Sequence, residues 1–453
     1  MLSSVRSMFR IPELRRQLMV TFALLVVYRL GFHVFLPGVN VDRIQELIKQ
    51  QSGSAFGALL NFAGAITGGG LNQAHLFSLG IMPYISASII FSLLVKVIPW
   101  LEQLSKEGES GRKKINQYTR YATVGLCLVQ SMFVVAYLRT GGGGGPSLVI
   151  GEYDTFFFYV STVLALTTGS LFVMWLGEQI TEFGVGNGIS LIIMAGIIAQ
   201  MPATMLKFVQ LEILNDQFSR SEVFTGALKF LLFLALFVAV VIACVIMQQG
   251  QRRIPIQQQK HTRGRRVYGG QRHFMPFRVN SAGVMPVIFA QSLLIIPAIL
   301  LSFIGLGDGG MVQGTGFWGI VLTIVLVYFF TYFWISLQFN PVEMANNMKE
   351  YGSFIPGIRP GRNTAVYLET IMNRITMVGA AFLSAVTVFP TIVTTVLDVN
   401  IYMASFLGGT GILIVVSVAL DIVQKVESHL LMRHYEGFGR RGRGGIRRRG
   451  GGR

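Results

Sequence analysis

Apolar runs long enough to span a membrane alternate with short polar segments along the whole chain. A helix needs about 20 mostly apolar residues to cross a bilayer core, and charge-poor runs of about 17–25 residues are candidate spans. The chain is 52% hydrophobic and only 13% charged, which is atypical of a soluble domain. We therefore predict an all-α polytopic membrane protein with ten spans, at Leu18–Leu36, Leu76–Val95, Tyr121–Leu138, Thr155–Leu176, Ile189–Leu206, Phe230–Met247, Val284–Ile304, Phe317–Leu337, Thr376–Leu397 and Tyr402–Leu420.

Basic residues are distributed unevenly between the two sides of these spans. The side that holds both termini carries most of the 38 Lys and Arg residues. Cytoplasmic loops are enriched in Lys and Arg, so this asymmetry predicts cytoplasmic termini. The exceptions are Arg29, Arg43, Lys49, Arg139, Lys207, Arg220 and Lys229.

The longest external segment near the middle of the chain separates five spans from five spans. An odd number of spans in each half inserts the second half upside down, as in inverted repeats around a central pathway. We expect an N-terminal half at 1–206, a hinge loop at 207–225 and a C-terminal half at 226–422. The remaining 423–453 is a basic tail, whose Gly/Arg-rich end we expect to lack fixed structure.

A short glycine-rich segment, about 55–70, precedes the second span. A half-apolar segment too short to cross a bilayer can lie at membrane depth only where protein or a water-filled cavity satisfies its backbone. The segment therefore suggests a plugged cavity. Composition alone favours the alternative, an ordinary external loop before an ordinary helix.

Ionisable residues are scarce inside the predicted spans. Arg29 and His33 both lie in the outer half of the first span, and no Asp or Glu lies in mid-span. Ion-coupled transporters usually keep such groups at mid-membrane, so their scarcity argues against the main alternative, a secondary transporter of a small solute. The sequence also lacks HExxH, P-loop and histidine metal-ligand patterns, and we predict no enzyme, no metal site and no cofactor.

Polar, uncharged side chains interrupt several spans. They could face a cavity or form hydrogen bonds between helices, and the sequence leaves both readings open. These residues are Ser86, Ser88, Ser92, Gln130 and Gln291.

Several long motifs resemble the SecY family, the channel subunit of the bacterial Sec protein translocon. The resemblance runs in order from about residue 10 to residue 438. The motifs are Ile81–Ser88, Lys106–Arg112, Trp175–Glu182 with Gly186–Ser190, Gly250–Ile254, Arg265–Gln271, Phe339–Pro341 and Phe354–Gly361.

The resemblance implies a plugged hourglass channel made of two five-helix halves. Its plug falls on about 55–70, including Phe56, Leu59, Leu60, Asn61, Phe62 and Ile66. Its waist is a ring of aliphatic side chains, which by motif position fall on Ile81, Ile85, Ile193, Ile288 and Ile414. Such a ring blocks ions by dewetting and by closing around a moving chain.

The resemblance also implies a lateral gate and a docking surface. The gate is formed by the second and seventh spans with their neighbours, and its residues are Ser86, Ser88, Ile89, Gln130 and Gln291. Docking of a motor or a ribosome falls to loops 248–280 and 340–373, with Arg252, Arg253, Arg265, Arg266 and Arg359.

The partners and location also follow from the resemblance. The expected partners are SecE and SecG subunits, the SecA motor ATPase, the ribosome, signal peptides, translocating polypeptides and membrane lipids, and the expected location is the bacterial plasma membrane. Phe183 departs from the family pattern, which has a basic residue after Glu182.

Overall fold

The computed structural model describes residues 12–40, 43–44, 74–144, 147–151, 155–212, 220–259, 261–263, 266–268, 272–291, 293–294, 316–397 and 410–444. The chain is mostly helical. Its longer helices are α2 (Pro12–Leu30), α5 (Met82–Val97), α6 (Pro99–Lys106), α7 (Glu109–Gly144), α8 (Phe156–Phe183), α9 (Gly188–Glu212), α10 (Arg220–Gln249), α12 (Phe317–Gln338), α13 (Pro341–Glu350), α14 (Arg362–Leu397) and α16 (Thr410–Gly444). A 3-10 turn, η1 (Gly31–His33), follows α2, and a further short helical stretch covers 285–291.

Helices occupy most of nine predicted spans and the start of the seventh. In the described part of the chain, five helices are long and apolar enough to cross a membrane, or six if the bent pair α5 and α6 counts as one span. The all-helical membrane domain predicted from hydropathy is therefore confirmed. The rest of the seventh span lies outside the described residues.

The first predicted span is displaced. We expected it at 18–36, but α2 ends at Leu30, and the chain continues through η1 into extended backbone. A side chain at Gly31 would collide with the ring of Phe77, so the backbone passes directly against this ring where α2 ends. Phe35 then forms an antiparallel bridge with His75.

The second span begins later than predicted and ends in a sharp bend. Residues 76–81 form turns, and α5 begins at Met82 with Pro83 in its first turn, where proline needs no hydrogen-bond partner. At the other end the chain bends by 98° between α5 and α6. Pro99 supports this bend, because the residue before proline is pushed out of the helical region, and Ile98 is extended.

The basic tail is more ordered than we predicted. We expected the Gly/Arg-rich end to lack fixed structure, but α16 continues to Gly444. The helix thus extends beyond the predicted span end at Leu420. Residues 445–453 lie outside the described part.

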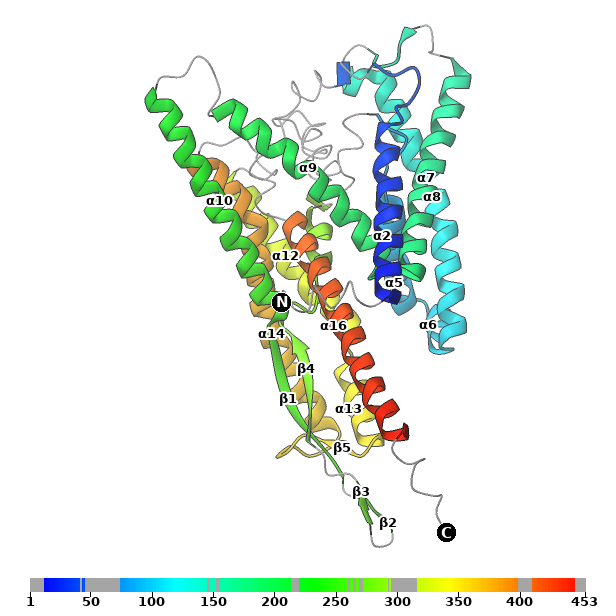
Figure 1. Cartoon of the computed structure of the whole chain (residues 1–453), viewed down its shortest axis with the longest axis vertical. Helices are drawn as coiled ribbons and strands as arrows, with labels where there is room; N and C mark the ends of the chain where they lie inside the picture. Colours follow the sequence, from blue (N-terminus) through cyan, green and yellow to red (C-terminus); the bar gives the residue numbers. More distant parts are fainter. Residues whose placement is uncertain are drawn as a thin grey trace.

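A small β-sheet stands outside the helical domain, at the end of the molecule that holds the C-terminus (Figure 1). Strand β1 (Gln251–Gln258) pairs antiparallel with β4 (Arg272–Arg278) and with β5 (Ser353–Phe354). Two short strands, β2 (His261–Arg263) and β3 (Arg266–Tyr268), form a second ribbon. Hydropathy predicted neither ribbon, because these segments are too polar and irregular to show a strand pattern.

The helices form two groups. Helices α2, α5, α7 and α8 pack together on one side, while α10, α12 and α14 form the other side (Figure 1). Helix α9 packs against both α8 and α16, so the two groups meet along α9 and α16. Each group has its own buried cluster, and a third cluster lies where α9 meets α16.

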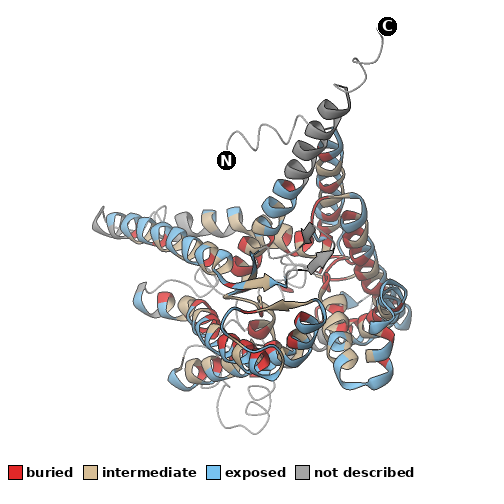
Figure 2. Ribbon diagram, turned by 90° about the horizontal axis from the view of Figure 1, so that it is seen from below, coloured by how far each residue is buried: buried red, intermediate tan, exposed pale blue. Residues whose placement is uncertain are grey.

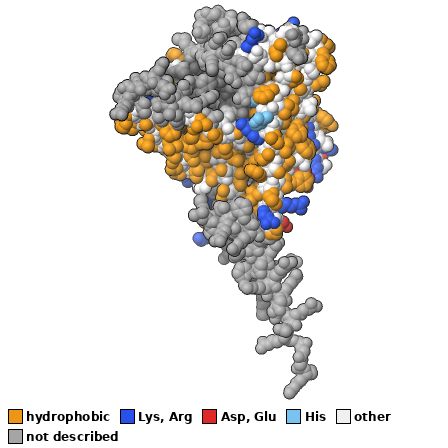
Figure 3. All heavy atoms as spheres, turned by 45° about the horizontal axis from the view of Figure 1, so that its top comes forward, with side chains coloured by type: hydrophobic (Ala, Val, Ile, Leu, Met, Phe, Trp, Pro, Cys, Tyr) orange, Lys and Arg blue, Asp and Glu red, His pale blue; other side chains and the backbone are white. Residues whose placement is uncertain are grey.

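The outward surface of the helical domain is strongly apolar. Figure 3 shows hydrophobic side chains as a broad band across one face. Helix α10 shows this most clearly, since Leu228, Leu231 and Ile246 are all exposed. Seen from the end that carries the sheet, exposed residues follow the outward sides of the helices (Figure 2). An apolar exterior of this extent suits contact with lipid.

Candidate functional site

Isoleucines from three separate elements pack together where the two helix groups meet. Ile81, Ile193 and Ile414 are buried in one hydrophobic cluster, and Ile85 packs against it while remaining partly exposed. We call these four residues the central cluster. They are four of the five residues that the resemblance places in an aliphatic ring.

The ends of helices position the central cluster. Ile81 directly precedes α5 as its N-cap, and Ile85 follows one turn later, with its N–H donating to the Ile81 carbonyl at 3.1 Å. Ile193 and Ile414 lie within the first two turns of α9 and α16. The branched aliphatic side chains at these positions thus belong to one buried apolar cluster between the two helix groups.

Ile288, the fifth predicted ring residue, lies next to this cluster rather than in it. Its N–H donates to the Val284 carbonyl at 3.3 Å, so the two residues are one helical turn apart. Val284 packs against the larger buried cluster that contains Ile81, Ile193 and Ile414, and also against the core of the second helix group. The start of the seventh span thus reaches the junction through Val284.

The predicted gate residues lie on α5, on α7 and at the start of the seventh span. Ser86, Ser88 and Ile89 are partly buried on α5, which packs against α7, where Gln130 is also partly buried. Among the described residues, no hydrogen bond joins Ser86, Gln130 and Gln291 to one another.

Gln291 has a buried side-chain oxygen that lacks a hydrogen-bond partner in the described part of the chain. Its Oε1 atom is buried and accepts no hydrogen bond from the described protein atoms. An unsatisfied buried acceptor costs about 1–3 kcal/mol. Gln291 therefore has a polar atom that is free to bond to a neighbour if the surrounding helices move.

The predicted plug cannot be placed from the structure. Phe56, Leu59, Leu60, Asn61, Phe62 and Ile66 all lie outside the described residues.

Two of the predicted docking arginines project from the sheet. Arg252 and Arg253 are exposed on β1, whereas Ile254 beside them is only 2% exposed and anchors the strand in an apolar cluster. Arg266 lies on β3, and Arg265 lies outside the described residues. The strand pair β1–β4 thus holds Arg252 and Arg253 outward on a fixed framework.

Arg359 lies at the tip of a firmly anchored loop between α13 and α14. Ile355 is 3% exposed, and it and Ile358 pack into the same apolar cluster as Ile254. Gly357 and Gly361 adopt left-handed φ values of 83° and 103°, which a side chain would strain. The Arg359 side chain is exposed, and its carbonyl accepts a 3.0 Å hydrogen bond from Thr364 Oγ1.

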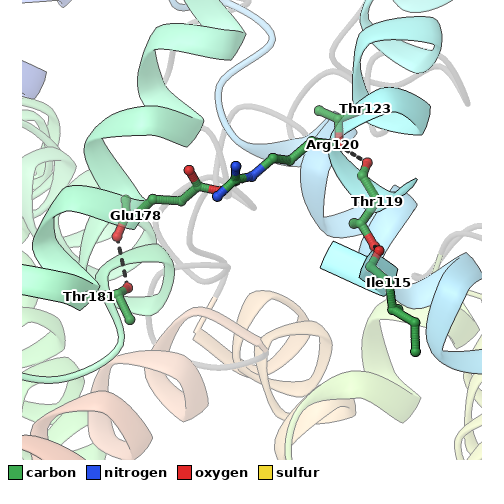
Figure 4. Close-up of polar contacts among 7 residues, drawn as sticks. Ile115, Thr119, Arg120, Thr123, Glu178 and Thr181 are labelled. Carbon is green, nitrogen blue, oxygen red and sulfur yellow. Dashed lines mark hydrogen bonds and ion pairs between the residues drawn. The ribbon is translucent and has the colours of Figure 1, made fainter. Parts of the chain in front are cut away.

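An ion pair that we did not predict joins α7 to α8. Arg120 Nε lies 2.7 Å from Glu178 Oε1, and the hydroxyls of Thr119 and Thr123 bond to carbonyls within α7 (Figure 4). Glu178 belongs to the motif Trp175–Glu182, but the motif gave no indication that Arg120 is the partner of Glu178. Helix-to-helix partners are invisible in a single sequence.

The loop between α8 and α9 is fixed by two threonines. Thr21 Oγ1 of α2 accepts a hydrogen bond from the Val185 N–H at 3.1 Å, and Thr181 Oγ1 accepts one from the Gly188 N–H at 2.8 Å. Phe183, the departure from the family pattern, is 54% exposed just before this loop. The two hydrogen bonds therefore fix the backbone of the loop, while the Phe183 side chain stays exposed.

His75 is buried just before α5, among aromatic rings. Its ring centroid lies 5.7 Å from that of Phe32 and 5.0 Å from that of Phe35. Burial, with further contributions from His33 and Arg29, lowers the pKa of His75 to about 4. The imidazole is therefore neutral at physiological pH and packs as an aromatic group.

Comparison with known proteins places this chain among translocase subunits. Residues 75–423 match the SecY family. The protein translocase subunit SecY of Thermus thermophilus is 42% identical over 451 residues, covering 98% of this chain and 99% of that protein. The SecY subunit of Mycobacterium tuberculosis strain H37Rv is 40% identical over 454 residues, covering 97% of this chain and 100% of that protein.

Solved structures agree on the fold. A protein-conducting channel superposes with a TM-score of 0.59 at 17% identity, covering 91% of this chain and 92% of its own. A SecY structure, described for a plug domain that stabilises the closed channel, gives a TM-score of 0.58 at 18% identity, with 91% and 92% covered. Sequence identity to the translocase subunits extends over nearly the whole chain, and the chain belongs to the SecY family.

Proposed function

We propose that this chain is a protein-conducting channel, which passes unfolded polypeptides across a membrane and releases hydrophobic segments sideways into the bilayer. The observation that carries the proposal is the central cluster, in which Ile81, Ile85, Ile193 and Ile414 meet at the junction of the two helix groups. The translocase names of its relatives support the same activity.

The proposed waist works by apolar sealing. A constriction lined by isoleucine side chains excludes water and ions unless a chain fills it, because water leaves a narrow apolar pore. Branched side chains can move apart for an extended polypeptide without breaking any hydrogen bond. We assign Ile288 to the same waist in the conducting state, since Val284, one helical turn away, packs against the larger buried cluster that contains Ile81, Ile193 and Ile414.

The proposed gate lies between α5 and the seventh span. A hydrophobic signal sequence that leaves the pore gains about 0.8 kcal/mol for each methylene it buries in lipid. Ser86, Ser88, Ile89, Gln130 and Gln291 would tune this step. The unsatisfied Oε1 of Gln291 supports a role in gate movement, because any rearrangement that supplies a donor stabilises the new state.

The proposed plug is the segment at about 55–70, which would close the external side of the pore. Deleting Phe56–Thr67 should leave a folded channel with a higher probability of ionic leak in planar bilayers. The same single-channel recordings on the intact chain provide the control. An unchanged open probability would reduce this segment to an ordinary loop.

The energy for transport would come from cytoplasmic partners. A channel of this kind contains no motor, and we assign docking of the SecA motor or the ribosome to the exposed Arg252, Arg253 and Arg359, together with Arg265 and Arg266 of the same basic loop as Arg252. Two of the solved channels with this fold were determined in ribosome complexes. We further propose SecE and SecG as companion subunits, cytoplasmic termini and a bacterial plasma membrane location.

Reconstitution tests the proposal directly. The purified chain with its companion subunits is placed in vesicles with the motor, ATP and an unfolded secretory protein. Uptake of the protein into a protease-protected compartment, dependent on motor and ATP, is the expected result. Uptake of small solutes without protein translocation would overturn the proposal.

A further inference from the structure

An open groove of about 620 Å³ lies between α12 and α14, at the ends of these helices nearest the β-sheet. It is separate from the central cluster. Helix α12 ends near the sheet and α14 begins near it. The groove between them therefore runs along both helices, from the sheet end toward the apolar middle of the helical domain. It is lined by Tyr328, Phe329, Tyr332, Phe333, Ile335, Ser336, Phe339, Pro341, Glu369, Met372 and Asn373.

Aromatic rings dominate the wall formed by α12. Phe329, Tyr332 and Phe333 are 59%, 38% and 39% exposed, although each carries a large ring. Positions four apart lie on the same side of a helix, which stacks Phe329 above Phe333 with their rings 9° from parallel. Exposed ring faces attract cations through the aromatic quadrupole.

The opposite wall supplies the one charged side chain among the described residues that line the groove. Glu369 is exposed on α14, and no Lys or Arg is among the residues that line the groove. The described cytoplasmic surface elsewhere is rich in Lys and Arg, so a carboxylate facing aromatic rings makes this groove locally selective for a cation. Polar groups lie beside it, namely Ser336, Asn373 and the Tyr332 hydroxyl, which donates to the Asn373 carbonyl at 3.4 Å.

The order of these groups along the groove matches the order of groups in a phospholipid. Pro341 and Phe339 follow the end of α12, and Glu369 lies one helical turn nearer the sheet than Asn373, which Tyr332 contacts. A ligand therefore meets the carboxylate first, then the uncharged polar groups Asn373 and Tyr332, then the rings of Phe329 and Tyr328. These suit an ammonium, a phosphate and an acyl chain in turn.

We propose that this groove is a binding site for a phospholipid with a primary amine headgroup, that is, phosphatidylethanolamine. The ammonium would contact Glu369 and the ring face of Phe333, and the phosphate would accept a hydrogen bond from the Asn373 side-chain amide, because the Ser336 and Tyr332 hydroxyls already donate to the Phe333 and Asn373 carbonyls. Anionic headgroups are disfavoured, because they would place a second negative charge beside Glu369. The site lies apart from the central cluster and does not depend on the transport activity.

Native mass spectrometry of the purified full-length complex tests the site. The protein is titrated with equal amounts of phosphatidylethanolamine and phosphatidylglycerol that share the same acyl chains. We expect the first bound lipid to be mainly phosphatidylethanolamine. Glu369→Gln should lower that preference about fivefold, which corresponds to the loss of one partly exposed ionic or cation–aromatic contact.

Two further variants make the outcome decisive. Glu350→Gln removes an exposed carboxylate from α13 outside the groove and should leave the preference unchanged. Phe333→Leu keeps the groove apolar but removes the ring face one turn nearer to Glu369, so it should weaken phosphatidylethanolamine binding even if Glu369→Gln does not fold. Equal retention of both lipids by the wild type, or an effect of Glu350→Gln as large as that of Glu369→Gln, would overturn the proposal.

Discussion

Arg120 on α7 and Glu178 on α8 form an ion pair with 2.7 Å between Nε and Oε1, although 58 residues separate them in sequence. Both side chains are partly exposed, at 50% and 26%. Solvent screens such a pair, so its contribution to stability is about 0.2–1 kcal/mol. Its main effect is to fix the rotation of α7 against α8 near the start of the α8–α9 loop.

Reversing both charges should test this pair. Glu178→Gln is expected to lower the free energy of unfolding by less than about 1 kcal/mol, and the double change Arg120→Glu with Glu178→Arg should recover most of the loss. Thermal unfolding in detergent at low and high salt measures both. Glu109→Gln is the matched control, because Glu109 pairs with Lys113 on α7 where both side chains are highly exposed. If the double variant is no more stable than expected from adding the stability losses of Arg120→Glu alone and Glu178→Arg alone, the two residues do not interact.

Close contact between α8 and α9 predicts a glycine-specific effect. A Cβ at Gly188 would collide with the Gly177 carbonyl oxygen, which belongs to the facing backbone and cannot move aside easily. Gly188→Ala should therefore destabilise the protein by about 1–3 kcal/mol. Gly125→Ala on α7 is the control, since nothing lies within 4 Å of its Cβ. Unfolding temperatures of the two variants in the same detergent decide the point, and equal values would refute the contact.

Hydropathy and motifs predicted different parts of this molecule. Charge-poor runs predicted the helical membrane domain, because burial in lipid demands long apolar segments whatever their neighbours. They misplaced the end of the first helix, at Leu30, and the start of the second, at Met82, because these ends depend on the packing of Gly31 against Phe77 and on the Phe35–His75 bridge. Such contacts join distant residues and leave no periodic signal.

The ring isoleucines could be selected from the many isoleucines in the chain only through the resemblance to the SecY family. Composition gave no reason to single out Ile81 or Ile414 from other apolar residues, yet the motif positions led to residues that pack together at the junction of the halves. The Arg120–Glu178 pair and the groove beside Glu369 remained unpredicted. Both require knowing which faces of two antiparallel helices meet, and one sequence does not contain that information.

The central cluster predicts a leak when it is made polar. Ile85→Ser introduces a hydroxyl at a partly exposed position next to the cluster, so we expect the protein to fold but to hold water in the constriction. Ion conductance in planar bilayers should rise above that of the wild type. Ile90→Ser is the matched control on α5, where Ile90 is 45% exposed. A rise of equal size in both variants would indicate general disturbance of α5 rather than loss of a seal.

His75 predicts a loss of stability in mild acid. Its folded-state pKa of about 4 is below the ordinary value of 6.5, so the unfolded chain binds a proton first as the pH falls. The contribution of His75 to the free energy of unfolding is fully present above about pH 6.5 and is lost progressively as the pH drops toward 4. His75→Phe should flatten this part of a plot of unfolding temperature against pH.

The control for His75 is His273→Gln, because His273 is exposed on β4. That change should leave the pH dependence as it is in the wild type. An unaltered acid slope in His75→Phe would assign the effect to other groups.

Arg359 predicts a docking defect without a folding defect. The loop is anchored by the buried Ile355 and by the Thr364 hydrogen bond, which uses the Arg359 carbonyl and leaves its exposed side chain outside this anchor among the described residues. Arg359→Glu should therefore leave the unfolding temperature and ion leak near wild-type values. Motor-driven translocation should fall at least tenfold, because a guanidinium can form two parallel bonds to an acidic partner that a carboxylate would repel.

The matched control is Lys349→Glu, which makes the same change of charge at an exposed position of α13. If Arg359 acted only through the net positive charge of this face, the two variants would be equally impaired. Because a stiff loop tip costs little entropy to dock, we expect the defect to be confined to Arg359→Glu. Motor binding to vesicles, measured beside translocation, should fall in parallel. Near-normal transport by Arg359→Glu would remove Arg359 from the docking surface.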